Sequence, residues 1–254
     1  MSSTGWTPKQ ATAFLLEREL FGMKFELVRI KALLQELGNP ESTFKVVHVV
    51  GTNGKTSTTR FAAAALAAGG TRVGAYVSPH LTGFHERVLI SSDLGVMEEL
   101  SPEEFASALE ETVTAAQRIE EELLGGELVT QFELVTAAAF VAFERAGVEV
   151  AAVEAGLGGR WDATNVFESP KAVVLTSVGI DHTQWLGGDV ESIASEKLAV
   201  LGSGDVLFVS PDLPEPVMLI ARQAAEEAQA RIDVVQTPKG GVPELAALGG
   251  FQRQ

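Results

Sequence analysis

Short runs of apolar residues alternate with longer amphipathic runs along most of the chain. The apolar runs are rich in β-branched residues and lack polar alternation, which predicts buried strands at residues 45–51, 71–78, 148–156, 171–179, 205–210 and 232–237. The amphipathic runs predict helices at residues 7–20, 25–38, 55–70, 101–126, 130–147, 189–202 and 215–231. Buried strands that alternate with helices predict an α/β fold, with a mostly parallel sheet and helices on both faces.

Local signals mark several of the helix ends. Thr7-Pro8 suits a helix start, Gly38 before Asn39-Pro40 suits a helix stop, and Ser101 with Glu104 forms a capping box. Residues 79–100 have no helical period, so we expect a long loop there that carries one short strand. Residues 238–254 are irregular.

Composition limits where the protein works and what it binds. The chain has 254 residues, of which 46% are hydrophobic, and no run long enough to cross a bilayer. It has no cysteine and no visible secretory signal, which fits a cytoplasmic protein. Its formal net charge of −15 argues against a nucleic-acid partner. We therefore expect no membrane and no nucleic acid among its partners, and small molecules instead.

One stretch carries a clear chemical pattern, "VVHVVGTNGKTSTTR" at residues 46–60. A buried strand leads into a glycine turn and a helix start, so backbone N–H groups and the helix dipole point at one spot. This pattern predicts a phosphate site formed by Gly51, Thr52, Asn53, Gly54, Lys55, Thr56 and Ser57. Lys55 would reach the phosphates of ATP, and the hydroxyl of Thr56 or Ser57 would reach Mg²⁺. The alternative is a structural turn with a surface lysine.

The loop is shorter than the usual Gly-x-x-x-x-Gly-Lys pattern, and "GTNGKTS" resembles the ATP loop of the Mur ligase superfamily. In the same order follow "YVSPHLTGFHERV", "TQFELVTAAAFVAF", "VEAGLGGRWDATNV" and "IDHTQWLG…IASEK". Together these motifs resemble folylpolyglutamate synthase/dihydrofolate synthase, the folate branch of that superfamily. The resemblance implies that residues 1–254 are a P-loop-type Mur ligase central domain, with a helical N-terminal segment at residues 7–38. A C-terminal ligase domain, which normally follows in the family, is expected to be missing from this sequence.

The resemblance implies an ATP-dependent ligase that adds L-glutamate to dihydropteroate or to a tetrahydrofolate through an acyl phosphate. ATP, Mg²⁺ at two sites, a folate-type substrate and glutamate are the implied ligands, and family members are often monomers. This chain would be the ATPase half, completed by a separate C-terminal domain. An alternative is a nucleotide- or folate-binding remnant without ligase activity of its own. An unrelated loop-type NTPase is a third, less specific interpretation.

The resemblance also assigns metal ligands and catalytic residues. Glu154 and Ser78 match residues that hold a first Mg²⁺, and His182 matches one on a second Mg²⁺. Lys197 matches a lysine that CO₂ carbamylates and that then helps to hold the second metal. Lys55, His182 and Lys197 are thus the expected catalytic residues. Judged alone, Glu154 would be a solvated strand end, His182 a loop histidine and Lys197 a surface lysine.

Two further motifs match the substrate pocket of the family. They comprise Thr130, Gln131, Phe132 and Glu133 of "TQFE", and Trp161. Phe132 and Trp161 could stack on a pteridine ring. From the residues alone, core aromatics are an equally good interpretation of both.

Overall fold

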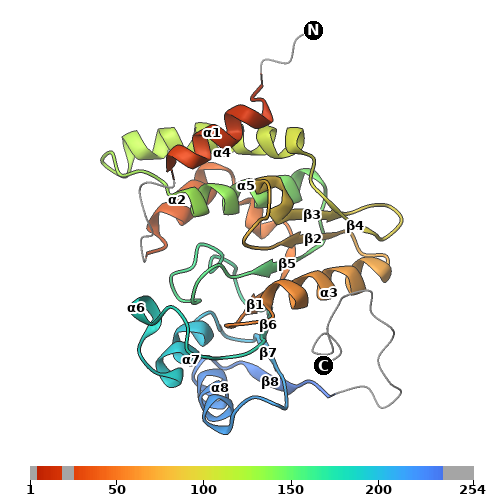
Figure 1. The fold of residues 1–254 in the computed structure, drawn as a ribbon, viewed down its shortest axis with the longest axis vertical. Coiled ribbons are helices and arrows are strands. Elements are labelled where there is room, and N and C mark those ends of the chain that lie inside the picture. The colour runs from red at the N-terminus through yellow and green to blue at the C-terminus, as the bar shows by residue number, and fades with distance from the viewer. Residues whose placement is uncertain (1–4, 19–25, 237–254) are drawn as a thin grey trace.

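The computed structural model describes residues 5–18 and 26–236, and an eight-stranded sheet runs through it (Figure 1). The strand order is β4-β3-β2-β5-β1-β6-β7-β8. The strands from β2 to β8 in that order pair in parallel, and only β3 and β4 join antiparallel at one edge. The bounds are β1 Lys45–Val50, β2 Val73–Tyr76, β3 Val88–Ser91, β4 Met97–Glu99, β5 Val150–Glu154, β6 Ala172–Leu175, β7 Val206–Val209 and β8 Arg231–Val234. The mostly parallel sheet expected from the sequence is therefore confirmed.

The antiparallel edge corrects one expectation. Residues 79–100 hold two strands rather than one, with Leu89 opposite Glu99. Ser92 N donates to Val96 O at 2.8 Å, and Gly95 adopts φ +72°, so a tight turn joins the strands. The second strand is only three residues long and mostly exposed, so it leaves no apolar run in the sequence.

Helices cover both faces of this sheet. They are α1 Pro8–Arg18, α2 Val28–Glu36, α3 Lys55–Ala68, α4 Pro102–Glu122, α5 Gln131–Arg145, α6 Thr183–Leu186, α7 Val190–Leu198 and α8 Glu215–Glu227. The expected capping box of Ser101 and Glu104 begins α4. The short α6 was not expected from the sequence. Residues 19–20 of the first expected helix, residue 25 of the second, residue 237 of the last strand and the irregular segment 238–254 lie outside the described residues.

Neighbouring residues of one strand show the two faces. A Cβ on Gly74 of β2 would meet the Phe143 ring of α5 at 2.7 Å, so this strand and helix pack in direct contact. The next residue, Ala75, packs instead in a cluster with Ala63 and Ala67 of α3. Because successive side chains of a strand point to opposite faces, α5 and α3 cover opposite sides of the sheet. No helix in the described part of the chain is long and apolar enough to cross a membrane.

This order of strands decides where the chemistry-bearing residues go. The parallel register places Val49 beside Glu154, and Val50 beside Leu175. The carboxyl ends of β5, β1 and β6 therefore lie next to one another at one edge. In parallel α/β sheets this edge is where ligands bind.

Candidate active site

The glycine loop after β1 has the backbone that close packing requires. Gly51 adopts φ +150°, and a Cβ there would lie 1.9 Å from Thr176 Oγ1. Gly54 adopts φ +84° and is the N-cap of α3. Both positions thus favour glycine because of their backbone conformation, and Gly51 also because a side chain would have no space.

Hydrogen bonds tie the loop to the segment after β6. Thr52 N donates to Ser177 O at 2.8 Å, and Asn53 N donates to Ser177 Oγ at 3.0 Å. Thr52 Oγ1 also accepts from Gly179 N at 3.1 Å. The strand order makes this possible, because β6 lies directly beside β1. The loop is therefore held from a segment about 125 residues further along the chain.

The loop has two features that phosphate binding requires. No side chain caps α3, which leaves the N–H groups of its first turn for an anion. Lys55 Nζ donates to Gly51 O at 3.0 Å and to Thr52 O at 3.2 Å, so the cation lies folded over the loop. Residues 51–55 thus form a turn that offers backbone N–H groups and a lysine to an anion.

A buried carboxylate stands beside the loop. Glu154 is 2% exposed and accepts from Thr56 Oγ1 at 3.0 Å and from Ser78 N at 3.1 Å. Burial raises the pKa of Glu154, while these two hydrogen bonds and the charge of Lys55 act in the opposite direction. A carboxylate and a hydroxyl next to a phosphate cradle suit Mg²⁺, which takes few protein ligands besides water and phosphate oxygens. Ser57 lies in the same first turn of α3.

Lys197 lies below the same loop rather than on the surface. It is 3% exposed, and its Nζ donates to Gly51 O at 3.0 Å. Burial, followed by the charge of Lys55, lowers the pKa of Lys197 to about 8. A large part of this amine is therefore neutral near pH 8, as its reaction with CO₂ requires.

His182 is the third of the expected catalytic residues. It adopts the left-handed conformation at φ 46° and is exposed, with Nε2 at 3.6 Å from Asp181 Oδ2. No group of three His, Cys, Asp or Glu side chains within residues 5–18 and 26–236 has the geometry of a ready metal centre. A metal at this edge would thus depend on the phosphates and on single protein ligands.

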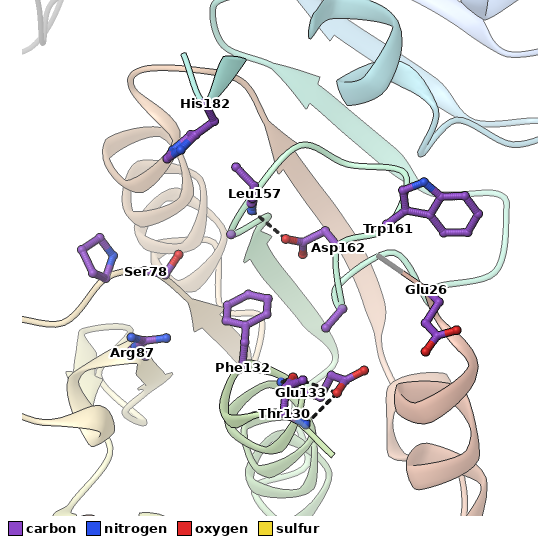
Figure 2. A pocket seen from close by; sticks show the side chains of 13 residues that line it. Glu26, Ser78, Arg87, Thr130, Phe132, Glu133, Leu157, Trp161, Asp162 and His182 are labelled. Carbon is purple, nitrogen blue, oxygen red and sulfur yellow. Dashed lines mark hydrogen bonds between the residues drawn. The ribbon is translucent and has the colours of Figure 1, made fainter. Parts of the chain in front are cut away.

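A cavity of about 350 Å³ opens next to this edge (Figure 2). Ser78 and His182 line it on the side of the phosphate loop. The remaining lining residues include Glu26, Arg87, Thr130, Phe132, Glu133, Trp161 and Asp162. Both aromatic residues line the cavity, but only Phe132 projects toward the middle of the lining residues; the half-exposed Trp161 lies at their edge, beyond Asp162, with its ring turned away from Phe132.

The "TQFE" motif also has a structural task. Thr130 is the N-cap of α5, and Glu133 returns to bond its N at 2.8 Å, which makes a second capping box. Glu133 also pairs with Arg29 at 3.2 Å. Gln131 points away from the cavity lining and donates to Leu15 O at 2.9 Å. Three of the four residues therefore line the cavity, and Gln131 connects α5 to α1.

Sequence reasoning missed a buried polar chain behind the cavity. Asp162 Oδ1 accepts from Thr164 Oγ1 at 2.5 Å, and Thr164 Oγ1 lies 2.9 Å from His48 Nε2. Burial raises the pKa of Asp162 and lowers that of His48 to about 3, so the imidazole is neutral. Asp162 Oδ2 accepts from Leu157 N at 2.7 Å. The Asp-x-Thr spacing gave a local signal for the Asp162 turn, but nothing in the sequence pointed to His48.

Comparisons with known proteins agree with this geometry. The family model of the Mur ligase middle domain matches residues 49–228. A dihydrofolate synthase/folylpolyglutamate synthase of Mycobacterium tuberculosis is 35% identical over 96% of this chain and 54% of its own length. The solved M. tuberculosis folylpolyglutamate synthase complexed with ADP and AMPPCP matches with a TM-score of 0.77 and 35% identity, over 88% of this chain and 50% of that one. An FPGS complex with AMPPCP and folate matches with a TM-score of 0.79 and 30% identity, over 89% and 53%. This chain thus spans about half the length of these relatives.

Proposed function

The chain belongs to the Mur ligase family through its middle domain, and from this premise we propose that it is the ATP-binding part of a folate–glutamate ligase. The complete ligase would add L-glutamate to dihydropteroate or to a tetrahydrofolate. The observation that carries the proposal is the meeting of a phosphate loop, a buried carboxylate and an aromatic cavity at one edge of the sheet. We place the complete ligase in the cytoplasm.

A carboxylate does not react with an amine until its oxygen is made a leaving group. Bound MgATP supplies the γ-phosphoryl group, which makes the substrate carboxylate an acyl phosphate and leaves ADP. The amine of glutamate then attacks the acyl carbon, and phosphate departs as the amide forms. Catalysis of phosphoryl transfer consists mainly of positioning and charge neutralisation.

The residues of this chain divide that work. Lys55 and the N–H groups of residues 51–57 hold the phosphates, and Thr56 or Ser57 with Glu154 and Ser78 hold the first Mg²⁺. For a second Mg²⁺ we propose His182 and carbamylated Lys197 as protein ligands. The pterin ring would stack on Phe132, with Trp161 at the rim of the cavity.

Lys55→Ala tests the nucleotide part. We expect loss of MgATP affinity in calorimetry and loss of carboxylate-dependent ADP release. Lys45→Ala is the matched control, because Lys45 is exposed at the other end of the same strand. Unchanged ATP affinity in Lys55→Ala would remove the nucleotide site from this loop. Binding of pteroate, measured by quenching of tryptophan fluorescence, tests the folate part separately.

A further inference from the structure

Among residues 5–18 and 26–236, three arginines are buried, and two of them have an acidic partner in that part of the chain. Arg18 bonds both carboxylate oxygens of Glu120, at 2.8 and 3.1 Å. Arg29 pairs with Glu26 and Glu133. Arg87 is 9% exposed, and within residues 5–18 and 26–236 no carboxylate lies at ion-pair distance from it. A buried cation without a counter-charge is costly, so this exception requires an explanation.

The neighbours of Arg87 are neutral and fix its position. Its Nε donates to His80 Nδ1 at 2.9 Å, and its guanidinium carbon lies 5.4 Å from the centre of the Phe84 ring. The Tyr76 hydroxyl is a third neighbour, and burial raises the pKa of Tyr76 to about 12, which keeps it uncharged. These contacts orient the guanidinium, but none of them neutralises it.

Arg87 lines the cavity, at the side where Ser78 also lies (Figure 2). The acidic residues of the cavity lie elsewhere in that view and are already engaged. Glu26 and Glu133 pair with Arg29, and Asp162 accepts from Thr164 and Leu157. The cavity thus offers hydrogen-bond acceptors and aromatic rings on one side and an unpaired cation on the other.

We propose that Arg87 is the receptor for the carboxylate end of the acyl substrate. The inference rests on the proposed function and adds to it the orientation of the substrate. A guanidinium matches a carboxylate through two parallel hydrogen bonds, and burial strengthens them. The carboxylate would then lie beside Ser78, whose N also bonds Glu154 at the phosphate edge. The protein has a net charge of −15, which repels anions overall. A buried cation in the cavity therefore favours binding of a ligand's anionic group at this position.

Pteroate and its carboxamide, which lacks the charge, form a direct test on the 254-residue chain. We expect the wild type to bind pteroate about 10- to 100-fold more tightly than the carboxamide, the size of a charged hydrogen-bonded pair. Arg87→Gln should bind both ligands about equally, with carboxamide and MgATP affinity unchanged. Arg87→Lys should keep part of the preference, because it keeps the charge and loses the planar fork.

Stability separates ligand recognition from a structural role. Without ligand, Arg87→Gln should lower the unfolding temperature only slightly, because the loss of the hydrogen bond to His80 is offset by the removal of an uncompensated buried charge. The matched control Arg18→Gln should lower the unfolding temperature, because it leaves Glu120 unpaired, and it should retain the preference for pteroate.

Three results would overturn the proposal. A carboxylate preference that survives in Arg87→Gln would exclude the carboxylate as its ligand. Loss of MgATP affinity in Arg87→Gln with an intact carboxylate preference would assign Arg87 to the nucleotide. If neither pteroate nor its carboxamide binds the wild type, the proposed substrate class fails, and the inference fails with it.

Discussion

Replacing Thr164 by valine should break the buried chain that joins Asp162 to His48. Valine keeps the shape of threonine and removes the hydroxyl, which donates to Asp162 Oδ1 at 2.5 Å and lies 2.9 Å from His48 Nε2. His48 Nδ1 already lacks a partner in the described residues, so either tautomer of the variant leaves one buried N–H without an acceptor.

The cost follows from these two lost contacts. An unsatisfied buried donor costs about 1–3 kcal/mol, and a hydrogen bond to a charged group contributes about 1.5–3 kcal/mol. We expect a loss of about 3 kcal/mol in the free energy of unfolding, out of roughly 5–15 kcal/mol for a typical domain. Thr164→Ser is the control, because it keeps the hydroxyl and removes one methyl group, which costs about 0.8 kcal/mol.

Urea unfolding, followed by the fluorescence of the three tryptophans, measures both variants. The pH dependence adds a second check. Burial raises the folded-state pKa of Asp162, so the folded state binds this proton more tightly than the unfolded chain, and stability falls as pH rises through that pKa. The Thr164 hydrogen bond lowers this pKa, so its loss extends the fall to higher pH.

The free energy of unfolding of Thr164→Val should therefore lie further below that of Thr164→Ser at pH 7 than at about pH 4, which is near the pKa of an aspartate in the unfolded chain. A difference below about 1 kcal/mol at pH 7 would refute the value placed on the hydroxyl. A difference that grows toward pH 4 would refute the inference that the Thr164 hydroxyl lowers the pKa of Asp162.

Three further predictions concern the phosphate edge and the whole ligase. Gly51→Ala should lower both the unfolding temperature and MgATP affinity, because its Cβ would lie 1.9 Å from Thr176 Oγ1. The control Gly188→Ala should change neither, because a Cβ there meets nothing within 4 Å. Unchanged values in Gly51→Ala would contradict the packing argument. In ¹³C-bicarbonate, a carbamate signal should grow as the pH rises through about 8, the lowered pKa of Lys197. The signal should vanish in Lys197→Arg and persist in the control Lys171→Arg, since Lys171 pairs with Asp205 at 2.9 Å. A signal that survives in Lys197→Arg would exclude this site. The 254 residues alone should bind MgATP and incorporate little glutamate into dihydropteroate. Adding the C-terminal half of a relative should restore ligation. Efficient ligation without that half would show that glutamate binds within these residues.

The sequence predicted what is local in this protein. The strands expected at 45–51 and 148–156, the glycine turn and the Ser101 capping box depend on residues close together in the chain. The structure has strands at Lys45–Val50 and Val150–Glu154, a turn between β1 and α3, and the capping box at the start of α4. The hairpin at residues 79–100 was missed because β4 is short, polar and at the edge of the sheet. The helix α6 was missed because four residues do not show a period.

The missed parts of the candidate site have a different cause. His48 and Thr164 are 116 residues apart, and Arg29 and Glu133 are 104 apart. Such pairs exist only after β5 and β1 have come together and α2 has packed on α5. Each residue taken alone has an ordinary interpretation, so only the assembled fold assigns it a partner.

Arg87 is the extreme case, because its proposed role depends on the absence of a carboxylate partner among the residues that the structure describes. The absence of a carboxylate partner for Arg87 among the described residues can be recognised only when the nearby carboxylates have been located. Their positions come from the tertiary structure and not from a sequence pattern. Ser78 gives this observation its chemical meaning, since it lies in the cavity wall while its N bonds Glu154 at the phosphate edge. A carboxylate held by Arg87 would thus lie at the junction of the two sites, where an incoming phosphoryl group has to meet it.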